Sequence, residues 1–238
     1  MTPPSQSRSV PPLILFVMTA VTGVVDAVSF LALGHVFTAN MTGNIVFLGF
    51  AVAGAAGVSL PRTAIAVLAF VLGAVGGGRM AFQMSSNPAH HWASRAFGVD
   101  AFFLLAAAAA SRGLAQGQDS TQLFAVIAFT GIAMGFRNAT VRRVGMPDLT
   151  TTVLTLTITG LAADSSLAGG TNPRWQRRIA SILLMLTGAA AGGFILKYSV
   201  ALPLLVCGLC SGAAALMVLA RGPGLAESVP PIRHGEDR

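Results

Sequence analysis

The stretch GHVFTANMTGN, residues 34–44, lies between two runs that are each apolar enough to enter a lipid bilayer. It carries two glycines, two threonines and two asparagines. Hydroxyl groups can satisfy the backbone groups that become free where a membrane helix breaks, and Gly43 permits unusual backbone angles at such a break. Irregular backbone is tolerated at membrane depth only inside protein or beside a cavity. The stretch therefore predicts a broken membrane helix next to a polar cavity.

The composition of the whole chain is that of a membrane protein. Of its 238 residues, 54% are hydrophobic and 10% are charged, and the mean hydropathy is +0.73, whereas soluble domains carry about 25% charged residues. The net charge of +7 comes from basic residues that lie mainly at the ends of apolar segments. Such charges set orientation against the cytoplasmic leaflet. We therefore expect a lipid bilayer as the partner and no nucleic-acid binding.

Eight apolar segments follow one another along the chain, most of them near the roughly 20 residues that a spanning helix needs. Their approximate ranges are 12–33, 37–56, 63–82, 97–110, 123–140, 149–162, 178–196 and 200–220. The fold class is therefore all-α, a polytopic helix bundle that forms a single membrane domain over residues 12–221. The tails at 1–11 and 222–238 are rich in proline, serine and charge, and we expect them to be disordered.

The basic residues also bear on how many segments cross the membrane. If all eight cross, the 15 Lys and Arg residues divide nine to six, which is a weak bias. If the second and sixth segments enter and return on one side, the division becomes 12 to 3, with Arg62, Arg112 and Lys197 on the minority face. Seven crossings divide them 11 to 4. Within this range of six to eight, we favour six crossings and two part-spanning segments.

The two halves of the chain resemble each other. TGVVDAVSFLALG (22–34) is similar to TGIAMGFRNATVRRVG (130–145), FTANMTGN (37–44) to TTTVLTLT (150–157), and RTAIAVLAFVLGAVGGG (62–78) to RRIASILLMLTGAAAGG (177–193). The matches keep the same order at offsets of 112 to 115 residues, with Gly23 matched to Gly135 and Asp26 to Asn138 in the first pair. We therefore expect a fused duplication of four segments, with repeat one at 12–112 and repeat two at 120–221. Six crossings make these repeats inverted, as in many secondary transporters.

Polar residues inside the apolar segments mark a candidate site. Asp26 lies about 12 Å from Gly34 along a helix, and an aspartate at the membrane centre costs about 2.5–3.5 kcal/mol on insertion scales. Such a residue usually has a partner or a function, and the candidate partners are Arg137, Arg142 and Arg143. We predict a substrate or ion site lined by Asp26, Asn40, Thr42, Asn44, Asn138, Arg142, Thr151 and Thr155.

Two functions are compatible with this cluster. In the first, the protein is a secondary transporter or channel for a small solute or ion, with the site at the repeat interface. In the second, it is a structural or accessory membrane protein that transports nothing, and the polar cluster only locks helix packing. The sequence carries no Walker motif, so any transport would be secondary or channel-like.

Small residues four apart occur once in each half, in GAVGG (73–77) and GAAAG (188–192). This spacing lets two helix backbones approach closely in lipid, where no hydrophobic effect drives helices together. We expect Gly73, Gly77, Gly188 and Gly192 to pack helices between the two halves. A homo-oligomer interface is the second interpretation.

Catalytic and metal-binding patterns are not evident. The four histidines are His35, His90, His91 and His234, and they show no paired metal-ligand spacing. GLCSG at 208–212 is not a GxSxG nucleophile motif. Cys207 and Cys210 lie in an apolar run, where we expect them to pack as small side chains. We therefore expect no enzyme, no metal and no cofactor.

The motifs GVVDAVSFL, FTANMTGN, GFRNATVRR and TTTVLT together resemble the YoaK-like family of bacterial inner-membrane proteins, which is defined by a domain of unknown function. The resemblance covers nearly the whole chain between the tails. It implies a multi-pass protein of the bacterial inner membrane without an established substrate. The family's motif positions here are Asp26, Thr38, Asn40, Thr42, Gly43, Asn44, Asn138 and Arg142. The chain differs from the family at Arg137, where Gln is expected, and at Leu156, where Gly is common.

Overall fold

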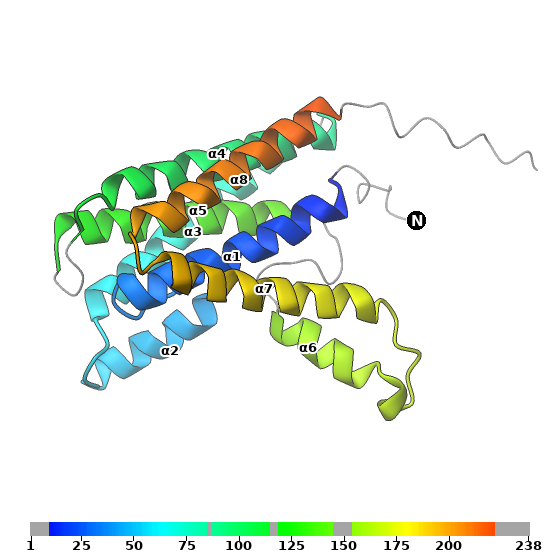
Figure 1. Cartoon of the computed structure of the whole chain (residues 1–238), viewed down its shortest axis with the longest axis horizontal. Helices are drawn as coiled ribbons and strands as arrows, with labels where there is room; N and C mark the ends of the chain where they lie inside the picture. Colours follow the sequence, from blue (N-terminus) through cyan, green and yellow to red (C-terminus); the bar gives the residue numbers. More distant parts are fainter. Residues whose placement is uncertain (1–9, 85–86, 115–118, 145–153, 222–238) are drawn as a thin grey trace, which may run out of the picture.

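A computed structural model describes residues 10–84, 87–114, 119–144 and 154–221, and within these residues the chain is helical and has no β-strand. These residues form eight α-helices and one short 3-10 helix, η2, and Figure 1 shows how the α-helices are arranged. The helices are α1 (Pro12–Ala32), α2 (Met41–Val52), α3 (Leu60–Gln83), α4 (Ala89–Ala110), α5 (Thr121–Val144), α6 (Leu154–Ala163), α7 (Trp175–Ile195) and α8 (Ala201–Ala220), with η2 (Ser166–Ala168) between α6 and α7. Residues 1–9 of the predicted N-terminal tail and the whole predicted C-terminal tail lie outside the described residues.

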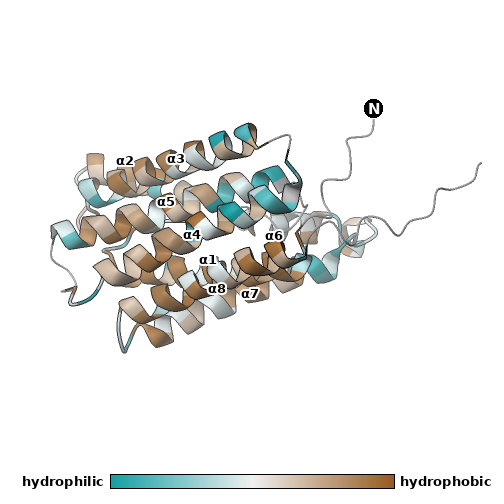
Figure 2. Ribbon diagram, turned by 90° about the horizontal axis from the view of Figure 1, so that it is seen from above, coloured by the Kyte–Doolittle hydropathy of each residue, from teal (hydrophilic) through white to brown (hydrophobic). Residues whose placement is uncertain are grey.

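Six of the helices are long and apolar enough to cross a membrane, namely α1, α3, α4, α5, α7 and α8. The other two, α2 and α6, are shorter apolar helices of 12 and 10 residues. The prediction of a polytopic all-α bundle is confirmed, and the lengths agree with six crossings and two part-spanning segments. Figure 2 shows hydrophobic residues along the lengths of the helices and many of the hydrophilic ones toward helix ends.

Two predicted boundaries were wrong. The fourth helix begins at Ala89 and not near residue 97, so residues 89–96, which lie between two of the predicted apolar segments, are helical. Trp92 and Ala93 are buried in the core there, and the Ser94 hydroxyl donates a 2.8 Å hydrogen bond to the Ala215 carbonyl of α8. The second helix begins at Met41 and not at residue 37, because residues 33–40 form an irregular connection.

Local sequence explains where α1 begins and ends. Pro12 stands at the first helical position, where its missing N–H is not needed. After Ala32, Gly34 and His35 have φ angles of 87° and 60°. Glycine adopts this left-handed conformation at little cost, so the helix stops and the chain reverses.

The long helices pack in pairs that each join an early and a late part of the chain: α3 on α5, α1 on α7 and α4 on α8. Further contacts of α4 with α5 and of α1 with α8 complete the bundle. The short helices lie outside it, α2 against α3 and α6 against α7. In Figure 1 their first turns lie toward the middle of the molecule, and they run outward toward opposite ends.

Candidate functional site

The connection after α1 turns back into the bundle. The backbone N–H of Ala39 donates a 3.1 Å hydrogen bond to Oδ1 of Asp26, and this carboxylate is buried in α1. Asp26 lies six residues before Ala32, about 9 Å along the helix from its end. The connection therefore reaches a buried group inside the bundle just before α2 begins, although Asn40 and Thr42, on either side of the start of α2, are exposed.

Asn44 holds this connection in place. Its Oδ1 accepts a 2.9 Å hydrogen bond from the Phe37 N–H, and its Nδ2 donates to the Phe37 carbonyl. Asn44 is fully buried. A side chain that satisfies both polar groups of one backbone residue acts as a clamp, because either buried group would otherwise lack a partner.

The inner cavity lies where both short helices begin. It has a volume of about 230 Å³. The described residues that line it are Thr22 and Asp26 of α1, Ala39 and Asn40 of the connection, Thr42 and Gly43 of α2, Leu154 and Thr155 of α6, and Met185 of α7. Residues from both halves of the chain thus surround the buried carboxylate, and the two helix N-termini that meet there carry partial positive charge.

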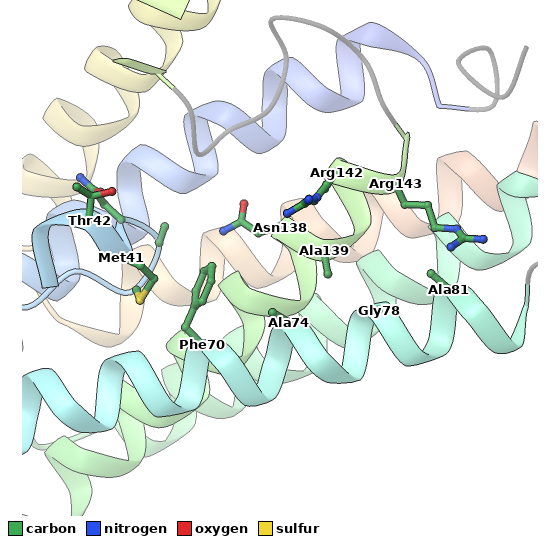
Figure 3. Close-up of a pocket in the computed structure, with 12 residues that line it drawn as sticks. Met41, Thr42, Phe70, Ala74, Gly78, Ala81, Asn138, Ala139, Arg142 and Arg143 are labelled. Atoms are coloured by element: carbon green, nitrogen blue, oxygen red, sulfur yellow. The ribbon is translucent and has the colours of Figure 1, made fainter. Parts of the chain in front are cut away.

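The outer cavity adjoins it and is larger, about 870 Å³. It shares Ala39, Asn40 and Thr42 with the inner cavity and continues along α3 and α5. In Figure 3, Asn138 and Arg142 of α5 point toward the start of α2, whereas Arg143 points toward Ala81 of α3. Both arginines are exposed, so the outer cavity reaches the surface at this end of the bundle.

The structure brings together most of the predicted site. Asp26, Asn40, Thr42 and Thr155 line the inner cavity, and Asn40, Thr42, Asn138 and Arg142 line the outer one. Asn44 lines neither cavity, because the clamp on Phe37 occupies its amide. Thr151 lies outside the described residues.

Arg137 was a candidate partner of Asp26, but the structure pairs it with Asp100. The guanidinium Nε donates a 3.2 Å hydrogen bond to Asp100 Oδ2, and Nη2 also donates to this oxygen. Nη2 donates to Ser211 Oγ at 3.1 Å, and Nη1 donates to Thr22 Oγ1 at 3.3 Å. Arg137 and Asp100 are almost completely buried. The network therefore joins α1, α4, α5 and α8.

Asp100 is the site-adjacent residue that the sequence reasoning missed. One of its carboxylate oxygens, Oδ1, is buried and has no hydrogen-bond partner among the described residues. A signal was available, because Asp26 and Asp100 are the two acids that fall inside predicted apolar segments. Charged residues at that depth usually have partners, and Arg137 was the corresponding buried base.

The four glycines selected from the sequence lie at close helix contacts. A Cβ on Gly73 of α3 would stand 2.1 Å from the Ile132 carbonyl oxygen of α5, and one on Gly188 of α7 would stand 2.1 Å from the Ala20 carbonyl oxygen of α1. A Cβ on Gly77 or Gly192 would stand within about 3 Å of Phe136 and Val24 backbone atoms, respectively. Only glycine permits these distances, so it sets the spacing of both helix pairs.

Comparison with known proteins places the chain in a family. Residues 14–217 match the family described as "Protein of unknown function (DUF1275)". Over 153 residues the chain is 31% identical to the UPF0700 transmembrane protein YoaK of Bacillus subtilis (strain 168). This alignment covers 64% of the chain and 66% of the relative, just under two thirds of its length. No solved structure matches. The chain therefore belongs to the DUF1275 family of proteins of unknown function, and it is a multi-pass helical membrane protein.

Proposed function

We propose that the protein is a secondary transporter or channel for a small solute or ion, and that the inner cavity is its central site. The observation that carries the proposal is the meeting of two short helices beside a buried carboxylate. Irregular backbone at membrane depth is tolerated where it lines a cavity, and secondary transporters form their sites from such helix ends near the bilayer midplane. Asp26, Thr42 and Thr155 supply the side chains of this site.

The helix contacts support the expected duplication. Gly73 approaches Ile132, and Gly188 approaches Ala20; the glycines are 115 residues apart and their partners are 112 apart. These are the offsets that relate the repeated sequences. The packing of α2 on α3 likewise has its counterpart in that of α6 on α7. A cavity at the junction of two such units fits the inverted-repeat architecture of transporters.

The site has different residues toward the end of α1 and toward the end of α5, which suggests that the α5 end is open and the α1 end is closed. At an offset of 112 residues, Phe30 and Leu31 of α1 correspond to Arg142 and Arg143 of α5. Phe30 stacks on Phe37 with 5.2 Å between ring centroids, and this aromatic pair lies one turn beyond Asp26. The arginines instead border the outer cavity. We infer that solute enters on the arginine side and that the aromatic side opens in a second state.

A structural role is the alternative, and one observation favours it. Asp26 accepts a hydrogen bond from Ala39, so the carboxylate helps to hold the connection before α2. A buried acid can be kept for such a contact alone. The two functions differ in whether water reaches the cavity from both faces of the membrane.

Thiol accessibility separates the two functions without knowledge of the solute. Thr42→Cys, in a Cys207→Ala/Cys210→Ala background, is reconstituted into vesicles and treated with a membrane-impermeant maleimide from each face. Thr42 lines both cavities. The transport proposal expects labelling from both faces. The matched control is Thr187→Cys, an exposed position on α7 next to exposed Leu183 and Leu186, which faces lipid in this topology and should stay unlabelled. Labelling of Thr42→Cys from only one face, or from neither, would contradict the proposal.

A further inference from the structure

The described residues that line the outer cavity carry an unbalanced positive charge. Arg142 and Arg143 are its two charged lining residues among those described, and no acid lines it there. Neither arginine makes a hydrogen bond or ion pair with another described residue. Asp26 lies in the adjoining inner cavity, where it accepts from Ala39. Two guanidinium groups in one cavity, with no counterion among the described residues, favour an anionic ligand.

These arginines stand in the last turn of α5, where basic residues often only offset the partial negative charge of the helix end. The Arg142 side chain does not point toward the C-terminal end of α5. Figure 3 shows its side chain directed back along α5 toward Asn138 and the start of α2. The guanidinium group therefore lies over the cavity, where its fixed set of donors can bind a carboxylate or phosphate.

The opposite end of the cavity also offers hydrogen-bond donors. The residue before α2, Asn40, makes no side-chain hydrogen bond that caps the helix. The first backbone N–H groups of a helix have no partner within the helix, and they carry partial positive charge. Asn40, Met41 and Thr42 all line the outer cavity. Donors thus approach this space from α2 as well as from α5.

The wall between these ends is apolar. Phe70, Ala74, Gly78 and Ala81 of α3 line it, and they extend over about 16 Å of helix. The volume of about 870 Å³ is within the range of pockets that bind small organic molecules, about 300–1,000 Å³. An apolar wall with charge at one end suits a ligand that has an apolar body and one anionic group.

We propose that the outer cavity binds a small organic oxyanion, with its carboxylate or phosphate on Arg142 and its apolar part along α3. This inference gives the substrate class of the proposed transporter from the outer cavity, which adjoins its central site, and it rests on the function proposed above. The same oxyanion chemistry is present in anionic lipid headgroups and in soluble organic acids. A cation of the same shape would face two guanidinium groups and no acid among the described lining residues, and should be rejected.

Binding is tested with the full chain in nanodiscs of phosphatidylcholine, by calorimetric titration. The probes are phenylacetate, acetate, and 2-phenylethylamine as a cation of similar shape. We expect phenylacetate to bind more tightly than acetate, because its ring reaches the apolar wall, and the amine not to bind. Arg142→Gln should weaken phenylacetate binding by about tenfold or more, since a charge-assisted hydrogen bond is lost. Arg142→Lys should retain part of the affinity. Arg112→Gln, which removes an exposed arginine at the end of α4, is the matched control and should leave binding unchanged.

A second arm replaces part of the phosphatidylcholine with phosphatidylglycerol. If phosphatidylglycerol and phenylacetate compete, and this competition is lost in Arg142→Gln, the same cavity binds both the lipid headgroup and the soluble acid. If only the lipid binds, the cavity is a site for the headgroup of an anionic lipid. Equal affinity for phenylacetate and the amine, or binding that Arg142→Gln leaves unchanged, would overturn the inference. Thiol labelling of Thr42→Cys is a separate test. If phenylacetate binds but Thr42→Cys is not labelled from both faces, the transport function is refuted while the oxyanion site remains supported.

Discussion

The buried pair of Arg137 and Asp100 allows a quantitative prediction. Replacing Arg137 by Met removes the guanidinium group and leaves the Asp100 carboxylate, 0% exposed, without a cation. Breaking a buried pair in this way costs about 3–5 kcal/mol, because the remaining charge is not compensated. Asp100→Leu should have a similar effect, since the described acceptors left to the buried guanidinium group are Ser211, Thr22 and the Met18 carbonyl, none of them charged.

The double variant Asp100→Leu/Arg137→Met should behave differently from either single variant. It removes both charges and also the buried Asp100 oxygen that has no partner. Well-packed apolar replacements of a buried pair are often neutral or stabilising. We therefore expect the double variant to lie within about 1 kcal/mol of the natural protein, so that the two changes are strongly non-additive.

Thermal unfolding in a mild detergent provides the assay. At about 2–4 °C per kcal/mol for a chain of this size, each single variant should lower the Tm by about 6–20 °C, and the double variant should recover most of this loss. Chemical unfolding in mixed micelles gives the same comparison as a free energy. If each single change lowered the free energy of unfolding by less than about 1 kcal/mol, the value of an exposed pair, or if the double variant lost the sum of both, the reasoning would be refuted.

Two further predictions concern packing and the clamp. Gly188→Ala should be less stable than its control Gly193→Ala by about 1–3 kcal/mol in the same unfolding assay, because the new Cβ would stand 2.1 Å from the Ala20 carbonyl oxygen, whereas at Gly193 the nearest atom is 3.6 Å away; equal stability would contradict the close contact. Asn44→Leu should lower the free energy of unfolding by about 1–3 kcal/mol for each backbone group of Phe37 left without a partner. It should also accelerate hydrogen exchange at the Phe37 amide and slow it at no other amide. Unchanged exchange at Phe37 would exclude the clamp.

The sequence predicted the helices better than their ends. Length and hydropathy sufficed for the eight segments, because a spanning helix must bury its own backbone groups in lipid. The start of α4 was missed because His90, His91 and Arg95 lower the local hydropathy. Trp92 and Ala93 nevertheless pack into the core from this turn. Helical periodicity within a polar stretch is weaker evidence than a long apolar run.

The sequence predicted which residues lie near Asp26, but only some of the interactions that they make. Residues with similar depth could be grouped from their distance to Gly34, and several of them share a cavity. Hydrogen-bond partners could not be assigned in this way, because depth alone does not show that Asn44 bonds to both backbone groups of Phe37 while Asp26 accepts from the Ala39 N–H. The pairing of Arg137 with Asp100 depends on α4 lying beside α5, and sequence spacing does not determine which helices are neighbours.

The glycine contacts have a mechanical consequence, because each joins helices from different halves of the chain. A rearrangement that preserved these contacts would keep α3 with α5, and α7 with α1. The moving bodies would then be two composite units, neither of which is encoded by a continuous stretch of the sequence. The long contact between α4 and α8 would be the seam between them, on the side of the bundle away from the two short helices, and bending along this seam would widen or narrow the space beside Asp26.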